Sequence, residues 1–127
     1  MPTRAGLADR NVLAVVDDPA LRASLQFALE VEGFSVDTFA TGEELLAKAP
    51  LPRRACLLLD HVVPRVDGIE IAAALRRHGV DFPAILMTAD TREIMRRRAN
   101  AAGLTVLEKP LLGNALAEAV RLALGDC

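Results

Sequence analysis

The chain has 127 residues, of which 52% are hydrophobic and 25% charged, and its formal net charge is −2 at neutral pH. This length predicts one domain with a full hydrophobic core, and the small net charge argues against electrostatic attraction to nucleic acid or a membrane. The first ten residues lack the apolar segment of a signal peptide, and no apolar stretch approaches the roughly 20 residues of a membrane span. Two cysteines without zinc or disulfide spacing fit a reducing, cytoplasmic setting.

Short apolar segments alternate with longer helical patterns along the chain. We expect strands at 12–16, 34–39, 55–59, 83–87 and 104–107. Capping residues and helical periodicity predict a helix after each strand, starting near Asp18, Thr41, Asp67, Asp90 and Leu112. The expected helix ends are near Gly33, Pro50, His78, Gly103 and Gly125. This alternation predicts a doubly wound α/β domain with a parallel sheet and helices on both faces.

The domain is expected to span residues 11–125, after an N-terminal tail of residues 1–10. The segment between the third strand and the third helix, from Asp60 to Gly68, reads as a long loop. Because these elements account for nearly the whole sequence, we expect no output domain in this chain.

Polar side chains follow four of the predicted strands at the point where each strand ends. Asp17 and Asp18 follow the first strand, Asp60 the third, Thr88 the fourth and Lys109 the fifth. Ligands of open α/β sheets bind outside the carboxyl ends of the strands. We therefore expect these acids, the hydroxyl and the amine to converge on one site.

This set of groups suits phosphoryl transfer to a carboxylate. Asp60 supplies an oxygen nucleophile, and neighbouring acids can hold Mg²⁺, which prefers hard oxygen ligands. Lys109 supplies a cation and Thr88 a hydrogen-bond donor for the phosphoryl oxygens. The sequence therefore predicts a site for phosphate and metal.

Five short segments carry a resemblance to a known family. They are Val-Val-Asp-Asp-Pro-Ala-Leu-Arg (15–22), Leu-Leu-Leu-Asp (57–60), Pro64 with Val-Asp-Gly (66–68), Met-Thr-Ala (87–89) and Glu-Lys-Pro (108–110). In this order and spacing, over about residues 11–124, they resemble the receiver domain of bacterial two-component response regulators. Glu-Lys-Pro together with Thr-Gly-Glu-Glu-Leu-Leu is similar to FixJ-type receivers.

The resemblance implies a flavodoxin-like (βα)5 fold with strand order 2-1-3-4-5. It implies that Asp60 accepts a phosphoryl group from the phosphohistidine of a histidine kinase or phosphotransfer protein, in a Mg²⁺-dependent reaction. Asp17, Asp60 and the backbone carbonyl of Val62 would hold the metal, while Thr88 and Lys109 would bind the phosphoryl group and couple it to movement. The peptide bond before Pro110 would be cis.

Two positions depart from the family pattern. A gapless match places Val16 where the family has its first acid, Asp17 at the direct metal-ligand position and Asp18 at a variable position. The alternative register needs a one-residue deletion and pairs Asp17 with Asp18 as metal ligands. The switch position, an aromatic residue in many receivers, is Val106, and the segment up to Lys109 looks one residue short.

Other functions remain open at this point. A pseudo-receiver would bind partners without phosphate, and Val16 and Val106 favour it. A haloacid-dehalogenase-type phosphatase needs a second acid where Val62 stands, so we expect a signalling module with no catalytic turnover of its own beyond gaining and losing its phosphoryl group. No helix-turn-helix pattern remains for direct nucleic-acid binding.

A basic stretch on the fourth helix bears on association. Its residues Arg92 and 96–98 form either a solvated face or a partner-facing patch. We expect phosphorylation to alter self-association, as a homodimer, or partner association through the surface of the fourth helix, fifth strand and fifth helix.

Overall fold

A parallel sheet forms the centre of the computed structural model, which describes residues 10–48, 50–63, 66–109, 111 and 114–125. Within these residues the sheet has five strands: β1 (Asn11–Val15), β2 (Ser35–Phe39), β3 (Cys56–Asp60), β6 (Ala84–Thr88) and β7 (Leu104–Glu108). They lie in the order β2-β1-β3-β6-β7. Counted along the chain this is 2-1-3-4-5, the expected order of a flavodoxin-like fold.

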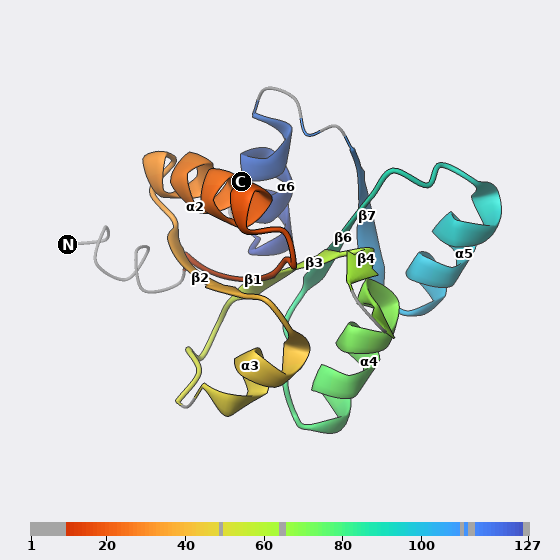
Figure 1. Cartoon of the computed structure of the whole chain (residues 1–127), viewed down its shortest axis with the longest axis horizontal. Coiled ribbons are helices and arrows are strands. Elements are labelled where there is room, and N and C mark those ends of the chain that lie inside the picture. Colours follow the sequence, from red (N-terminus) through yellow and green to blue (C-terminus); the bar gives the residue numbers. More distant parts are fainter. Residues whose placement is uncertain (1–9, 49, 64–65, 110, 112–113, 126–127) are drawn as a thin grey trace.

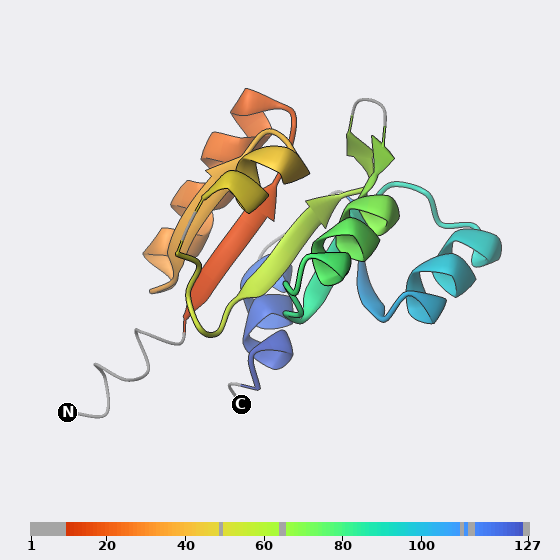
Figure 2. The ribbon, with the colours of Figure 1, turned by 90° about the horizontal axis from the view of Figure 1, so that it is seen from below.

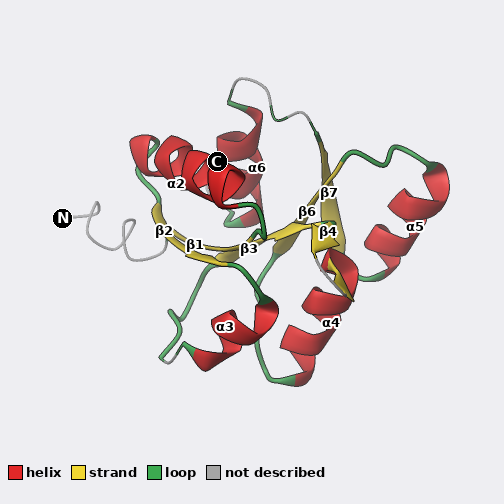
Figure 3. Ribbon diagram, viewed as in Figure 1, coloured by secondary structure: helices red, strands yellow, loops and turns green. Residues whose placement is uncertain are grey.

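Helices cover both faces of the sheet. They are α2 (Pro19–Val31), α3 (Gly42–Ala47), α4 (Gly68–Arg77), α5 (Glu93–Ala101) and α6 (Ala115–Ala123). α2 and α6 lie on one face and α3, α4 and α5 on the other (Figures 1 and 3). No helix among the described residues is long and apolar enough to cross a membrane.

The alternation of side chains along β1 divides the core into two clusters. Val12, Ala14 and Val16 point toward α2 and α6, whereas Leu13 and Val15 point toward the three helices opposite. All five side chains are at most 1% exposed. Both faces of β1 are therefore buried, as expected for a parallel sheet between helical layers.

Local capping chemistry starts three of the helices where the sequence predicts. The Asp18 carboxylate accepts the Ala20 N–H at 2.9 Å, and the Asp67 carboxylate accepts the Glu70 N–H at 2.9 Å. At α3 the Thr41 hydroxyl accepts the Glu44 N–H at 3.1 Å, while the Glu44 carboxylate accepts the N–H of Ala40 at 3.2 Å. The bonds to Asp18, Thr41 and Asp67 each satisfy a backbone donor that the first helical turn leaves unpaired.

Two local expectations are wrong. The expected loop after Asp60 contains an antiparallel hairpin of β4 (Val62–Val63) and β5 (Val66–Asp67), seen beside the start of α4 in Figure 2. Asp90 does not cap α5, whose N-cap is Arg92 without a side-chain hydrogen bond. The Asp90 carboxylate instead accepts the Arg92 N–H and binds the Arg92 guanidinium at 2.7 Å. The expected start of the last helix at Leu112 lies outside the described residues, and α6 begins at Ala115.

Candidate functional site

Asp60 lies at the carboxyl end of the central strand β3 and is only 4% exposed. Its Oδ1 accepts a hydrogen bond from the Lys109 Nζ at 2.8 Å. A carboxylate this deeply buried needs a compensating charge, because its transfer from water is otherwise costly. Lys109 supplies that charge from a point 49 residues further along the chain.

The end of β7 brings Lys109 to Asp60. Glu108 is the register partner of Thr88 on β6, and the Lys109 N–H donates to the Thr88 carbonyl oxygen at 2.8 Å. The apparent shortening of the segment before Lys109 therefore does not remove this side chain from the site. Pro110, whose preceding peptide bond was expected to be cis, lies outside the described residues.

Thr88 ends β6 next to β3 and is 1% exposed. Its Oγ1 accepts the N–H of Asp90 at 2.9 Å and lies 2.9 Å from Nδ1 of His61. His61 follows Asp60 directly, and its own N–H donates to the Met87 carbonyl oxygen at 2.9 Å. The threonine hydroxyl is therefore joined to the residue adjacent to the candidate phosphoacceptor.

Gly68 gives α4 its close approach to this site. Its N–H donates to the His61 carbonyl oxygen at 3.2 Å. A Cβ at this position would lie 2.7 Å from the Asp60 carbonyl oxygen and 2.5 Å from Leu86 Cδ1. Glycine is therefore required here, because any side chain would collide with the Asp60 backbone.

At the end of β1, three consecutive residues have different environments. Val16 is fully buried and donates its N–H to the Phe39 carbonyl oxygen at 2.9 Å. Asp17 is exposed, and Asp18 is the N-cap of α2. The Arg22 guanidinium donates from Nη1 to the carbonyl oxygens of Val16 at 2.9 Å and Asp17 at 3.0 Å. A cation therefore lies at the same strand end as the acids.

The oxygen donors suit a magnesium ion that keeps several of its bound waters. Asp17 and Asp60 follow neighbouring strands, because Val15 of β1 is the register partner of Leu59 of β3. Val62 pairs with Asp67 in the hairpin immediately after Asp60. Within the described part of the chain, no three His, Cys, Asp or Glu side chains gather as a metal-binding group. Two carboxylates with bound waters form a usual protein environment for Mg²⁺, so the donor set fits this ion.

Ion pairs surround the Thr88 side of the site. The Arg92 guanidinium beside Asp90 lowers the pKa of that carboxyl to about 2. Burial acts to raise the pKa of the Asp67 carboxyl, but the hydrogen bond from the Glu70 N–H and the Arg98 guanidinium outweigh it, so that this pKa is lowered. Both carboxylates are therefore ionised at neutral pH; Asp67 caps the start of α4, and Asp90 binds Arg92 within the β6–α5 connection.

The arginines at the start of α5 and within it do not form a patch of unpaired positive charge. Four acids pair with them: Arg92 with Asp90, Arg96 with Glu108, Arg97 with Glu93, and Arg98 with Asp67. Next to them, the expected switch residue Val106 is partly buried and packs against the core on the α3–α4–α5 face. An aliphatic side chain therefore occupies this place on β7.

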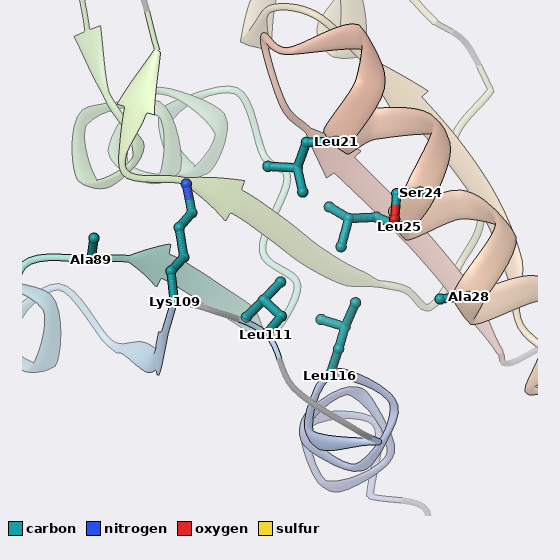
Figure 4. A pocket seen from close by; sticks show the side chains of 8 residues that line it. All are labelled: Leu21, Ser24, Leu25, Ala28, Ala89, Lys109, Leu111 and Leu116. Carbon is teal, nitrogen blue, oxygen red and sulfur yellow. The ribbon is translucent and has the colours of Figure 1, made fainter.

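An apolar pocket of about 530 Å³ opens between α2 and α6 beside the site. Figure 4 shows the side chains of Leu21 and Leu25 facing those of Leu111 and Leu116, with the Lys109 chain rising at one edge. Ser24, Ala28 and Ala89 complete its lining. Lys109 thus borders both the pocket and the Asp60 carboxylate.

The structure brings Asp60, Thr88 and Lys109 together as the sequence predicts, with Asp17 at the neighbouring strand end. Sequence reasoning missed His61 and Arg22. A lone histidine is usually a surface or loop residue, and only its position directly after Asp60 could have drawn attention to it. The carbonyl oxygens that Arg22 binds carry no sequence signature at all.

Comparison with known proteins gives consistent matches. Residues 12–121 match the model of the response regulator receiver domain. The chain is 35% identical over 85 residues to the alkaline phosphatase synthesis transcriptional regulatory protein PhoP of Bacillus subtilis, covering 67% of this chain and 35% of that protein. It is 40% identical over 79 residues to the response regulator MprA of Mycobacterium leprae, covering 62% of this chain and 35% of that protein. The match thus spans about a third of each relative's length.

Solved structures agree with this assignment. The structure of FixJ-N superposes with a TM-score of 0.82 at 31% identity, covering 94% of this chain and 96% of that one. The chemotaxis protein CheY4 of Vibrio cholerae superposes with a TM-score of 0.80 at 29% identity, covering 89% of this chain and 97% of that one. The fold, the order of the motifs and these matches together show that the chain belongs to the family of response regulator receiver domains.

Proposed function

We propose that this chain is a phosphoacceptor module of two-component signalling, with Asp60 as the residue that is phosphorylated. The observation that carries the proposal is the buried Asp60 carboxylate, which is paired with Lys109 at 2.8 Å. Thr88, with its hydroxyl, ends the neighbouring strand β6. In the reaction, an Asp60 oxygen attacks the phosphorus of a phosphohistidine, a P–O bond forms and the P–N bond breaks. The released imidazole then takes up a proton from water.

The residues of the site have separate tasks in this proposal. Lys109 neutralises Asp60 before the reaction and afterwards pairs with an oxygen of the phosphoryl group, as an ammonium does with phosphate. The Thr88 hydroxyl turns to donate to another phosphoryl oxygen. Asp17, Asp60 and the Val62 carbonyl would hold Mg²⁺, which when bound neutralises charge on the carboxylate and the phosphoryl oxygens.

The gapless register of the acidic residues is part of the proposal. Full burial of Val16 and the capping bond of Asp18 support it, because both side chains are engaged in packing or capping. Asp17 is then the single acid after β1 that is directed to the metal. Because Val16 cannot hold a metal-bound water and Arg22 adds a positive charge nearby, Mg²⁺ binding should be weak.

Incubation with acetyl phosphate and Mg²⁺, followed by intact mass measurement, tests the proposal. Wild type should gain the mass of one phosphoryl group, and Asp60→Asn should abolish the gain. Asp37→Asn is a matched control, because Asp37 is a carboxylate on the distant edge strand β2, where it pairs with Lys48. Full modification of the Asp60→Asn protein, or none of the wild type, would contradict the proposal.

Two partner surfaces follow from the site. The protein that carries the phosphohistidine, a histidine kinase or phosphotransfer protein in the cytoplasm, is proposed to contact the apolar pocket between α2 and α6, because the pocket borders Lys109. Phosphorylation is proposed to alter self-association through α5, β7 and α6. Sedimentation with and without a phosphoryl mimic tests the second surface, and a change mapped to α2 would show that the face is wrong.

A further inference from the structure

The hydrogen bond between His61 and Thr88 has a consequence for switching. The Thr88 Oγ1 lies 2.9 Å from Nδ1 of His61 and already accepts the Asp90 N–H at 2.9 Å. A hydroxyl that accepts a backbone donor still has one hydrogen to give. We assign this hydrogen to Nδ1 of a neutral His61 whose ring proton is on Nε2, the tautomer in which Nδ1 is the acceptor.

We propose that His61 is a positioning residue that holds the Thr88 hydroxyl in place while Asp60 is unphosphorylated. The inference rests on the proposed function, in which the same hydroxyl hydrogen must reach a phosphoryl oxygen on Asp60. One hydrogen cannot serve both acceptors, so His61 and the phosphoryl group compete for it. His61 thereby biases the chain toward its unphosphorylated conformation.

Hydrogen bonds on both sides fix the backbone of His61. The His61 N–H donates to the Met87 carbonyl oxygen at 2.9 Å, and the His61 carbonyl oxygen accepts the Gly68 N–H at 3.2 Å. The residue is thus tied to β6 on one side and to α4 on the other, while its side chain is only partly exposed. Because the backbone of His61 is already ordered, the bond to Thr88 costs only the rotamer freedom of the side chain.

Removal of the imidazole should strengthen binding of a phosphoryl mimic. In titrations with beryllofluoride and Mg²⁺, His61→Leu is expected to bind the mimic roughly two- to tenfold more tightly than wild type, the range that one net hydrogen bond supports. His61→Asn is the conservative control, because its Oδ1 can accept near the former Nδ1 position, and its affinity should stay close to wild type.

A double-mutant cycle separates this role from a general packing effect. In a Thr88→Val background, His61→Leu should leave beryllofluoride affinity unchanged, because no hydroxyl remains to be held. Equal effects of His61→Leu in both backgrounds, or no effect in wild type, would overturn the proposal.

Nitrogen-15 spectra test whether the hydrogen bond between His61 and Thr88 exists, even if the chain binds no phosphoryl mimic. The sequence has two histidines, His61 and His78, and Nδ1 of His78 bonds to the Ala74 carbonyl oxygen at 2.9 Å. At alkaline pH, Thr88→Val should shift the Nδ1 resonance of His61 and leave that of His78 in place. An unchanged His61 resonance would overturn the proposal, whereas failure of wild type to bind beryllofluoride would count against the proposed function alone.

Discussion

Gly68→Ala should displace the phosphoacceptor strand, because the added methyl group has no space. The new Cβ would lie 2.5 Å from Leu86 Cδ1, 2.7 Å from the Asp60 carbonyl oxygen and 3.2 Å from the Asp60 carbonyl carbon. The leucine methyl can rotate away, but the two Asp60 atoms belong to the backbone of the central strand. Overpacking of this kind costs typically about 1–3 kcal/mol, against about 0.4–1 kcal/mol that Gly→Ala gains by restricting the unfolded chain.

Gly42→Ala provides a matched comparison. Gly42 is the first residue of α3, as Gly68 is of α4, but its added Cβ would meet only the Ile71 side chain, at 3.2 Å from Cγ2. We therefore expect Gly42→Ala to be neutral or slightly stabilising and Gly68→Ala to lower the free energy of unfolding by about 1–2 kcal/mol. Urea denaturation measures both values, and the phosphorylation rate from acetyl phosphate should fall only for Gly68→Ala. Equal stabilities and rates of the two variants would refute the reasoning.

Three further predictions concern the metal, the core and the pocket. Val16→Asp should tighten Mg²⁺ binding roughly fivefold, or about 1 kcal/mol, and should lower stability because Val16 is fully buried. If Asp18→Ala weakens Mg²⁺ binding as much as Asp17→Ala does, the alternative register is favoured instead. Burial raises the pKa of the Cys56 thiol from 9.0 to about 12, so the unfolded chain ionises first. The stability that the neutral thiol contributes is complete below pH 9.0 and is lost as pH rises toward 12, by at most roughly 4 kcal/mol. Urea titrations of Cys56→Ala should lack this part of the decline, and an identical decline in the variant would exclude the thiol as its cause. Ser24 lines the pocket, so Ser24→Arg should slow phosphoryl transfer from a phosphohistidine protein but not from acetyl phosphate. Ala23→Arg, at the neighbouring exposed position, should slow neither reaction. If Ser24→Arg slows transfer from both donors, the defect lies at Asp60 rather than at the docking surface.

Much of the fold could be predicted from the sequence because its signals are local. Asp18 before Pro19, Thr41 before Glu44 and Asp67 before Glu70 each place a capping side chain within four residues of the amide that it binds. The convergence of Asp60 and Lys109 follows from topology, since parallel strands end at one edge of the sheet. The capping residues and the alternation of strands and helices can both be read from a single sequence.

The missed features depend on contacts that no local pattern encodes. His61 and Thr88 are 27 residues apart, and their hydrogen bond depends on the side-chain conformation of each. Arg22 binds backbone oxygens, which every residue carries. The β4 and β5 strands have two residues each, too few for a period to appear. Asp90 failed as a cap because Arg92, two residues on, binds its carboxylate.

The arginines of α5 are paired with acids, so that helix face carries little net charge despite its basic sequence. A partner that uses an acidic group to engage Arg97 or Arg96 must first displace Glu93 or Glu108, so ion pairs are exchanged rather than added. Association on this face should therefore depend only weakly on ionic strength, because salt screens the broken and the newly formed pairs alike. Selection among partners would then come from the shape of the α5–β7 surface rather than from its charge.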